Sequence, residues 1–206
     1  MSSPLVPDAP LIHDYLGPAV DVLASGKVIV YPTDTLYALG VDATNPHAVN
    51  LLRTIKGREA SKPILALVSD LEMLAQYAHV TTLAQELAER YLPGPLTLVL
   101  EAKNDRLHSI AGPDGSIGFR IPDMPFCLAL SRAFGKPITS TSMNLSGREQ
   151  ERTLEGMCAQ VGENAQHIAL LCDVGTLPPS KPSTIVDARG VQPIVLREGV
   201  VRIHTL

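Results

Sequence analysis

The sequence predicts a single-domain α/β protein in which a twisted open mixed sheet is flanked by helices. With 206 residues the chain can bury one sizeable core, and 45% hydrophobic against 18% charged residues is the balance of a folded globular protein. About seven short strand-like runs are mixed with about six helical segments. Because these do not alternate strictly as strand, helix and strand, a mixed sheet fits better than a purely parallel one. No internal repeat or linker divides residues 1–206.

Helices are marked by apolar residues at helical spacing and by capping residues. Apolar side chains recur at this spacing in residues 16–23. Asn45 predicts a helix cap with Pro46 at the first position, and that helix brings residues 56–58 to its C-terminal end. Thr82 and Gln85 predict a capping box. The remaining predicted helices cover residues 71–77 (capped by Asp70), 83–91, 125–134 and 153–161.

Strands are predicted where short, apolar, β-branched runs end at proline, glycine or polar residues. The first such run, residues 27–31, ends at Pro32 and leads into a Thr-Asp-Thr turn. The segment before residue 140 is a further short strand-like piece, and residues 104–116 form a polar, glycine-rich loop. The other predicted strands are residues 63–68, 96–100, 117–121, 168–172, 183–187 and 194–197.

Composition narrows the class of protein. A net charge of −4 argues against a generally basic nucleic-acid coat, although a local basic patch is compatible with it. Cys127, Cys158 and Cys172 are far apart and predict buried, reduced thiols of a cytoplasmic protein. Singly scattered histidines predict no metal site held by protein side chains. No apolar run reaches membrane-spanning length, and residues 1–12 predict a loose arm rather than an export signal.

Two polar stretches organise the interpretation of function. The first, KGREASK, puts Lys56, Arg58 and Lys62 within seven residues, and the second is the small-polar loop STSMNLSG at residues 140–147. Guanidinium and ammonium groups neutralise phosphates, while hydroxyls, amides and loop N–H groups add neutral hydrogen bonds. Together the two stretches are suited to a polyanion, and the alternative is a pair of solvated loops.

Further polar anchors lie at the ends of predicted strands or in loops, and in open α/β sheets ligands gather outside the carboxyl ends of strands. Thr35 lies in the turn after the first strand, Arg120 alternates with apolar neighbours on its strand, and Ser183 and Arg197 lie in the last two strands. Five converging cations would suit a site that holds a triphosphate and a carboxylate. The chain has no Walker motif, no GxGxxG and no nucleophile elbow, so no familiar nucleotide loop or acyl-transfer site is indicated.

In their order, these motifs resemble a known family. KVIVYPTDTLYALG, IKGREASKPI, LPGPLTLVL, IGFRIP, STSMNLSG, KPSTIVD and VLREG resemble the threonylcarbamoyl-AMP synthases of the YrdC/YciO-like fold, over about residues 13–203. The pairing of KxR with SxN is the specific part, and the STS and KPST segments are closer to the YciO branch. Leu67 stands where many members have a histidine. The resemblance implies one YrdC-like domain with a concave basic cavity.

The resemblance also implies an activity: L-threonine, bicarbonate and ATP are condensed to threonylcarbamoyl-AMP and pyrophosphate for the t6A modification of tRNA. ATP would come with Mg²⁺, and tRNA, double-stranded RNA and tRNA-modification proteins are the implied partners. Four residues resemble contacts to threonine or its carbamate: Thr35, Arg120, Ser142 and Ser183. Six resemble contacts to ATP, Lys56 also suiting bicarbonate: Lys56, Arg58, Lys62, Ser116, Asn144 and Arg197.

The chemistry fits these residue types without a protein nucleophile, because an attacking carbamate needs positioning and charge stabilisation. No general base is assigned. Two alternatives remain open at this point. One is a module that binds nucleotide or double-stranded RNA without turnover, in which phosphate contacts would make affinity fall steeply with salt. The other is a regulatory factor associated with the ribosome or tRNA.

Overall fold

The chain forms two mixed sheets with helices around them. The computed structural model describes residues 8–203 apart from 58, 60–61, 150 and 152. The helices are α1 (Asp8–Ala24), α2 (Pro46–Lys56), α3 (Leu71–Tyr77), α4 (Thr82–Tyr91), α5 (Pro125–Phe134), α6 (Leu154–Val161) and the 3-10 segments η1 (Asp105–Ile110) and η2 (Gly162–His167). The strands are β1 (Val28–Pro32), β2 (Tyr37–Gly40), β3 (Ala66–Leu67), β4 (Leu96–Glu101), β5 (Ser116–Arg120), β6 (Ile138–Thr139), β7 (Thr141–Ser142), β8 (Ile168–Leu171), β9 (Thr184–Asp187) and β10 (Ile194–Arg197).

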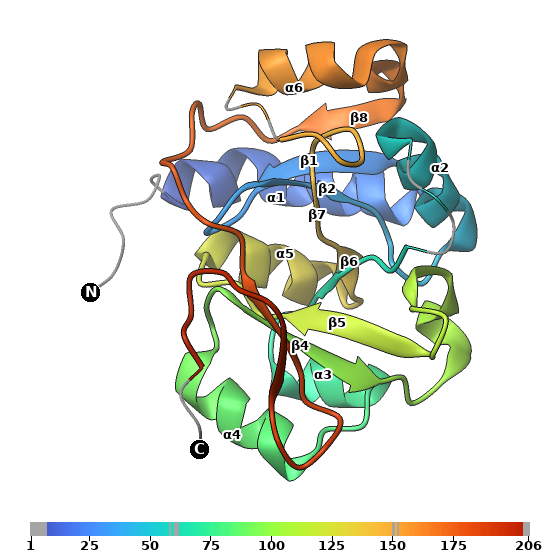
Figure 1. Ribbon diagram of the computed structural model, residues 1–206. Helices are drawn as coiled ribbons and strands as arrows, with labels where there is room; N and C mark the ends of the chain where they lie inside the picture. The colour runs from blue at the N-terminus through green and yellow to red at the C-terminus, as the bar shows by residue number, and fades with distance from the viewer. Residues whose placement is uncertain (1–7, 58, 60–61, 150, 152, 204–206) are drawn as a thin grey trace.

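The strands divide between a four-stranded sheet, in the order β7-β2-β1-β8, and a six-stranded sheet, in the order β10-β9-β4-β5-β3-β6. β1 runs antiparallel to β2 and parallel to β8, while β4 runs antiparallel to β5 and parallel to β9. Figure 1 shows the smaller sheet in the upper half of the molecule, the larger one below it and α5 between them. The predicted mixed α/β class with flanking helices is confirmed, and the predicted single sheet is in fact two.

The two sheets meet in a shared apolar layer. α1 packs against α5, and Leu23, Tyr31, Phe126 and Leu130 lie in one cluster of fully buried side chains. Burying an aromatic or leucine side chain of this kind stabilises the fold by about 1.5–3 kcal/mol. A larger cluster fills the space among the remaining helices and strands. Because α1 and α5 are packed together, the relative position of the sheets is fixed, and so is the space between them.

Local signals hold well for helices. The Asn45 side chain accepts the N–H groups of His47 and Ala48 at the start of α2, and Gly57, with φ of 56°, ends that helix in a left-handed conformation. The helical prediction for residues 83–91 is confirmed, but the cap is Thr81, whose hydroxyl accepts the Ala84 N–H. The predicted capping box of Thr82 and Gln85 is therefore wrong, because Thr82 is the first residue of the helix rather than its cap.

Three further expectations need correction. Residues 8–12 of the expected loose arm belong to α1, where Leu11 is buried against the apolar layer, and residues 1–7 lie outside the described part of the chain. Within the predicted strand 63–68 only Ala66–Leu67 pairs as strand. The loop 104–116 contains the 3-10 turn η1. In addition, Cys127 and Cys172 are buried as expected, while Cys158 is half-buried; none of the three is in a disulfide.

Candidate functional site

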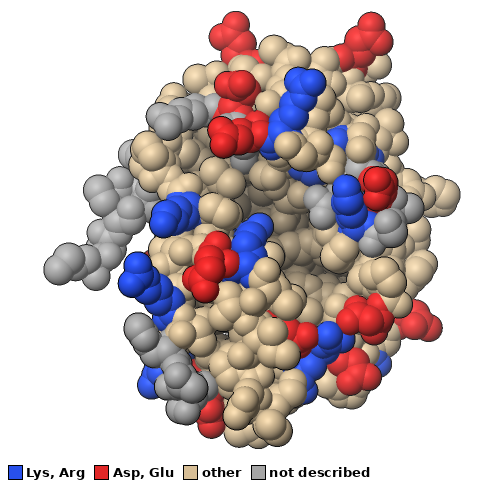
Figure 2. All heavy atoms as spheres, in the orientation of Figure 1, with Lys and Arg blue, Asp and Glu red and all other residues tan. Residues whose placement is uncertain are grey.

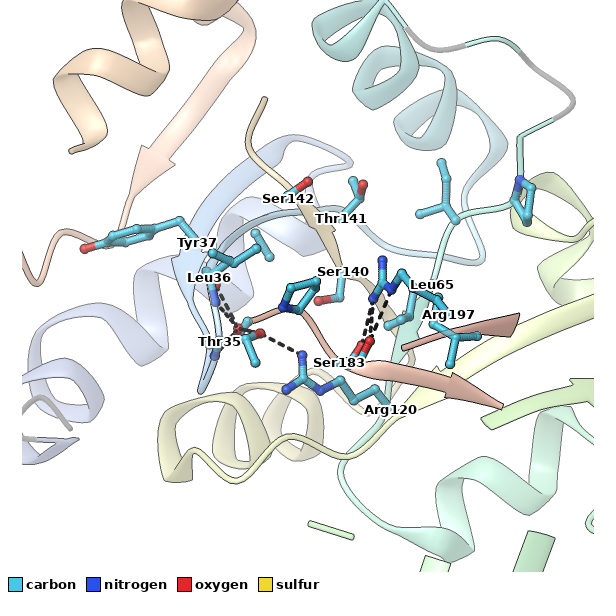
Figure 3. A pocket seen from close by; sticks show the side chains of 16 residues that line it. Thr35, Leu36, Tyr37, Leu65, Arg120, Ser140, Thr141, Ser142, Ser183 and Arg197 are labelled. Atoms are coloured by element: carbon cyan, nitrogen blue, oxygen red, sulfur yellow. Dashed lines mark hydrogen bonds between the residues drawn. The ribbon is translucent and has the colours of Figure 1, made fainter. Parts of the chain in front are cut away.

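A cavity of about 240 Å³ lies between the two sheets. Its walls come from the turn before β2 and the β6–β7 link on the smaller-sheet side, and from the segment before β3, the end of β5, and β9 and β10 on the other. Figure 2 shows a hollow on this face with both basic and acidic side chains around it, and Figure 3 shows the lining side chains. Four residues predicted to bind substrate, Thr35, Arg120, Ser142 and Ser183, line the cavity, together with Arg197.

The turn that carries Thr35 is fixed by a neighbouring hydroxyl. Thr33 Oγ1 accepts the backbone N–H groups of Thr35 and Leu36, at 3.2 and 3.1 Å, and donates to the Leu36 carbonyl at 2.7 Å. A threonine side chain can close such a turn because its hydroxyl both donates and accepts. The sequence therefore folds locally so that the Thr35 side chain faces the cavity (Figure 3).

Arg120 ends β5 and is held by three acceptors from two segments, the turn at Asp34 and Thr35 and the backbone at Gly94. Its Nε donates to the Gly94 carbonyl at 3.3 Å, one terminal nitrogen donates to Thr35 Oγ1 at 2.9 Å, and the other forms an ion pair with Asp34 Oδ1 at 2.6 Å. Its neighbour Phe119 is fully buried in the core. The expectation that Arg120 points into the cleft, away from the apolar side of its strand, is confirmed, and the residue as a whole is only 5% exposed.

Arg197 reaches the cavity from β10. Its guanidinium donates to the Ser183 carbonyl at 2.8 and 3.2 Å and to Ser183 Oγ at 3.1 Å, and that hydroxyl lies 2.9 Å from Thr97 Oγ1. Burial lowers the pKa of Arg197, and the positive charge of Arg120 lowers it further. The two guanidiniums are therefore close enough to repel each other, and an anionic ligand between them would relieve this repulsion.

The loop after β6 is held by hydrogen bonds from the last residue of α2. Lys56, the last residue of α2, is 2% exposed, and its ammonium donates to the Ser142 carbonyl and, at 2.9 and 3.0 Å, to the carbonyl and side-chain oxygens of Asn144. Ser142 Oγ donates to the same Asn144 oxygen, and the Asn144 amide donates to the Arg148 carbonyl. The KxR lysine and the SxN loop thus form one network.

A second cavity of about 540 Å³ lies beside the first, and Ser142 and Asn144 of this network line it. Ser142 and Arg197 line both cavities, whereas Asn144, Arg148 and Met157 line only the second. The segment 177–182, which crosses from the smaller sheet to the larger one, forms much of its opposite wall. The two spaces are therefore neighbouring compartments with a shared polar boundary.

The other predicted site residues lie elsewhere. Lys56 contacts the loop from its buried side rather than lining either cavity. Lys62 is exposed and lies 3.9 Å from Glu59. Ser116 begins β5, at the opposite end from Arg120, and its hydroxyl donates to Asp114 at 2.7 Å. Arg58 lies outside the described residues. The expected convergence of five cations on one cavity is therefore observed for two, Arg120 and Arg197, and the ligand roles of all five stay predictions.

Three residues at the site were not singled out from the sequence. Asp34 neutralises Arg120, and Arg148 lines the second cavity. The Tyr37 phenol donates to the Gly175 carbonyl at 2.8 Å and accepts the Val174 N–H at 2.9 Å, and burial raises its pKa to about 12. The only available signal for Asp34 was its place in the Thr-Asp-Thr turn, and nothing local marks Tyr37 or Arg148.

Comparison with known proteins shows which family has this sequence. Residues 21–199 match the Sua5/YciO/YrdC family model, which is described as telomere recombination. The chain belongs to the Sua5/YciO/YrdC family. Among curated relatives of this Sua5/YciO/YrdC protein, a threonylcarbamoyl-AMP synthase of Vibrio cholerae is 37% identical over 184 residues, covering 88% of this chain and 95% of the relative. That of Vibrio vulnificus is 34% identical over 183 residues, with coverages of 87% and 96%.

Solved structures agree with the family. P. abyssi Sua5 complexed with L-threonine has a TM-score of 0.82 and 28% identity, covering 95% of this chain and 55% of Sua5. This chain therefore spans little more than half the length of that protein. E. coli YciO has a TM-score of 0.78 and 30% identity, with coverages of 90% and 89%. The YrdC-like fold implied by the sequence is confirmed.

Two negative findings apply to the described residues. No helix there combines the length and the apolar character needed to cross a bilayer. Nor does any group of three or more His, Cys, Asp and Glu side chains there have the arrangement of a metal site.

Proposed function

We propose that this protein is an L-threonylcarbamoyl-AMP synthase, an enzyme of the nucleotidyltransferase type. L-threonine and bicarbonate would give a carbamate and water, and the carbamate with ATP would give threonylcarbamoyl-AMP and pyrophosphate. The observation that carries the proposal is the convergence of Arg120, Ser142, Ser183 and Arg197 on one small cavity beside a larger one. Supporting it are relatives named threonylcarbamoyl-AMP synthase and the L-threonine complex of a structural neighbour.

The sizes of the two cavities indicate which substrate each would hold. About 240 Å³ is below the roughly 300–1,000 Å³ typical of sites for drug-sized ligands, whereas about 540 Å³ is within that range. We therefore assign the smaller cavity to threonine and its carbamate and the larger one to ATP, which brings Mg²⁺ as part of the substrate complex. Ser142 and Arg197, which line both, would lie where the carbamate meets the α-phosphate.

Each side chain has a chemical task in this scheme. Arg120 would pair with the threonine carboxylate, and the Thr35 and Ser183 hydroxyls would hydrogen-bond the amino acid or carbamate. A carbamate oxygen then attacks the α-phosphorus, and the bond to the pyrophosphate leaving group breaks. Arg197 would stabilise the negative charge spread over the transferring group, and Asn144 would orient the nucleotide. Positioning and charge carry this reaction, so no protein nucleophile is required.

Pyrophosphate release tests the proposal. Purified protein is incubated with Mg-ATP, bicarbonate and each of the common amino acids in turn. We expect release only with L-threonine, dependent on bicarbonate, together with a product that has the mass of threonylcarbamoyl-AMP. A protein that binds ATP or double-stranded RNA but releases no pyrophosphate with any amino acid would be a binding module, and the proposed activity would be wrong. An active enzyme would supply the t6A modification of tRNA, with tRNA-modification proteins as downstream partners.

A further inference from the structure

Asp34 is the residue that fixes Arg120, and it is fixed in turn. One of its carboxylate oxygens pairs with Arg120 at 2.6 Å, and the other accepts the Asp123 backbone N–H at 3.2 Å. Both side chains of the ion pair are 6% exposed. Asp34 belongs to the turn between β1 and β2 of the smaller sheet, whereas Arg120 ends β5 of the larger one. The ion pair therefore joins the two sheets beside the smaller cavity.

The pairing determines what Arg120 can offer a ligand. Arginine has five N–H groups in a rigid plane. Within the described part of the chain, Gly94, Thr35 and Asp34 accept one N–H from each of its three nitrogens. That leaves one N–H on each terminal nitrogen for a carboxylate that enters the cavity. The direction of these two donors is set by the Asp34 carboxylate, because the guanidinium is planar and cannot rotate without breaking the ion pair.

We infer that Asp34 is a positioning and specificity-determining residue: it aims Arg120 at the carboxylate of a free α-amino acid and moderates the charge that this carboxylate meets. The inference rests on the proposed function. The threonine carboxylate is present in both substrate and product, so very tight binding would hold the product as strongly as the substrate and would not accelerate the reaction. An arginine with a partly neutralised charge and a fixed direction instead selects by geometry and releases the product.

The test compares L-threonine with L-threoninamide, in which an uncharged amide replaces the carboxylate. Calorimetry gives the dissociation constants of both for the wild type, Asp34→Asn and Asp34→Ala, and steady-state pyrophosphate release gives kcat and the KM for ATP. In Asp34→Ala we expect L-threonine to bind at least about tenfold more weakly, because the loss of a correctly directed charged hydrogen bond outweighs the stronger attraction of an Arg120 without its counter-charge. Unchanged or tighter binding of L-threonine would overturn the positioning role. L-threoninamide binding should change less than about threefold, and the KM for ATP less than about twofold.

Asp34→Asn keeps an oxygen for Arg120 but removes the charge, so its preference for L-threonine should lie between those of the wild type and Asp34→Ala. It is also the reporting variant if Asp34→Ala does not fold. The matched control is Asp42→Asn, which removes another buried carboxylate, paired with Lys136 at 2.8 Å and away from both cavities. This control should lose stability but keep the wild-type ratio of the two dissociation constants.

The outcomes separate the two proposals. If the wild type neither binds L-threonine nor releases pyrophosphate with it, the proposed function and this inference are both overturned. If the wild type is active but the Asp34 variants weaken L-threonine and L-threoninamide equally, Asp34 has only a structural role, and this inference alone is overturned. A purely structural role would also lower the thermal stability of the Asp34 variants, as we expect for the Asp42→Asn control.

Discussion

Replacing Lys56 by Met tests whether its ammonium stabilises the loop at Ser142 and Asn144 or binds the ligand. The substitution keeps most of the apolar stem of a side chain that is 2% exposed and removes the ammonium that donates to Ser142 and Asn144. A hydrogen bond to a charged group contributes about 1.5–3 kcal/mol. The three contacts do not add, because the loop residues are half-buried and water can replace part of what is lost.

We therefore expect the free energy of unfolding to fall by about 2–4 kcal/mol, roughly one to two such bonds. For a chain of this length each kcal/mol shifts the midpoint by about 2–4 °C, so Tm should fall by about 4–16 °C. Differential scanning calorimetry measures the shift. The control is Lys62→Met, since the Lys62 side chain is 49% exposed and lies 3.9 Å from Glu59, a pair of the kind that contributes about 0–1 kcal/mol. If Lys56→Met melts with the wild type yet loses ATP binding, the ammonium is a ligand contact and its stabilisation of the loop is refuted.

Two further variants test other parts of the structure. Arg120→Lys should lose threonine-dependent pyrophosphate release while keeping most ATP binding, because a single ammonium cannot satisfy Asp34, Thr35 and a substrate carboxylate in the geometry of a guanidinium. Turnover at saturating threonine and calorimetry of ATP binding measure the two effects. Unchanged turnover would contradict the assignment. Hydrogen bonds from Ser116 and Arg189 lower the pKa of Asp114 to about 2, and Arg189 also lowers the pKa of Asp187. A carboxyl with a lowered folded-state pKa stabilises the protein above its unfolded value and loses that contribution as pH falls from about 4 to about 2. Arg189→Ala should raise both pKa values and flatten this part of the stability profile, as measured by NMR titration and by urea unfolding at each pH; an unchanged profile would mean that the ion pairs at Arg189 contribute nothing.

What could be read from the sequence is mainly local. Asn45 and Pro46 predict the start of α2, because helix capping depends on residues only two or three positions away. β2 was not predicted as a strand, since all four of its residues are buried and no alternation of polar and apolar side chains marks it. The predicted strand 63–68 shortens because the Ile64 N–H bonds to the Ile110 carbonyl outside the sheet. Such pairings are settled by tertiary contacts.

The same division holds at the candidate site. Arg120 could be assigned to a cavity because its neighbours on the strand are apolar, so that its side chain had to point elsewhere. Its pairing with Asp34 joins residues far apart in the sequence, and no periodicity indicates it. Lys56 shows the converse: a cation at a helix end looks like a phosphate ligand in the sequence, but the fold turns it toward the loop carbonyls.

The way the sheets are threaded has a consequence for the order of folding. Val28 pairs in parallel with Ile168, and Leu96 pairs in parallel with Thr184, so each sheet joins segments that are far apart in the sequence. Closing such long loops costs conformational entropy before any contact repays it, which slows the step. Thr35 and Arg197 face the same cavity only after both pairings have formed. Ligand binding should therefore return with the slowest phase of refolding, and a growing chain can bind its substrates only after Arg197 has been synthesised.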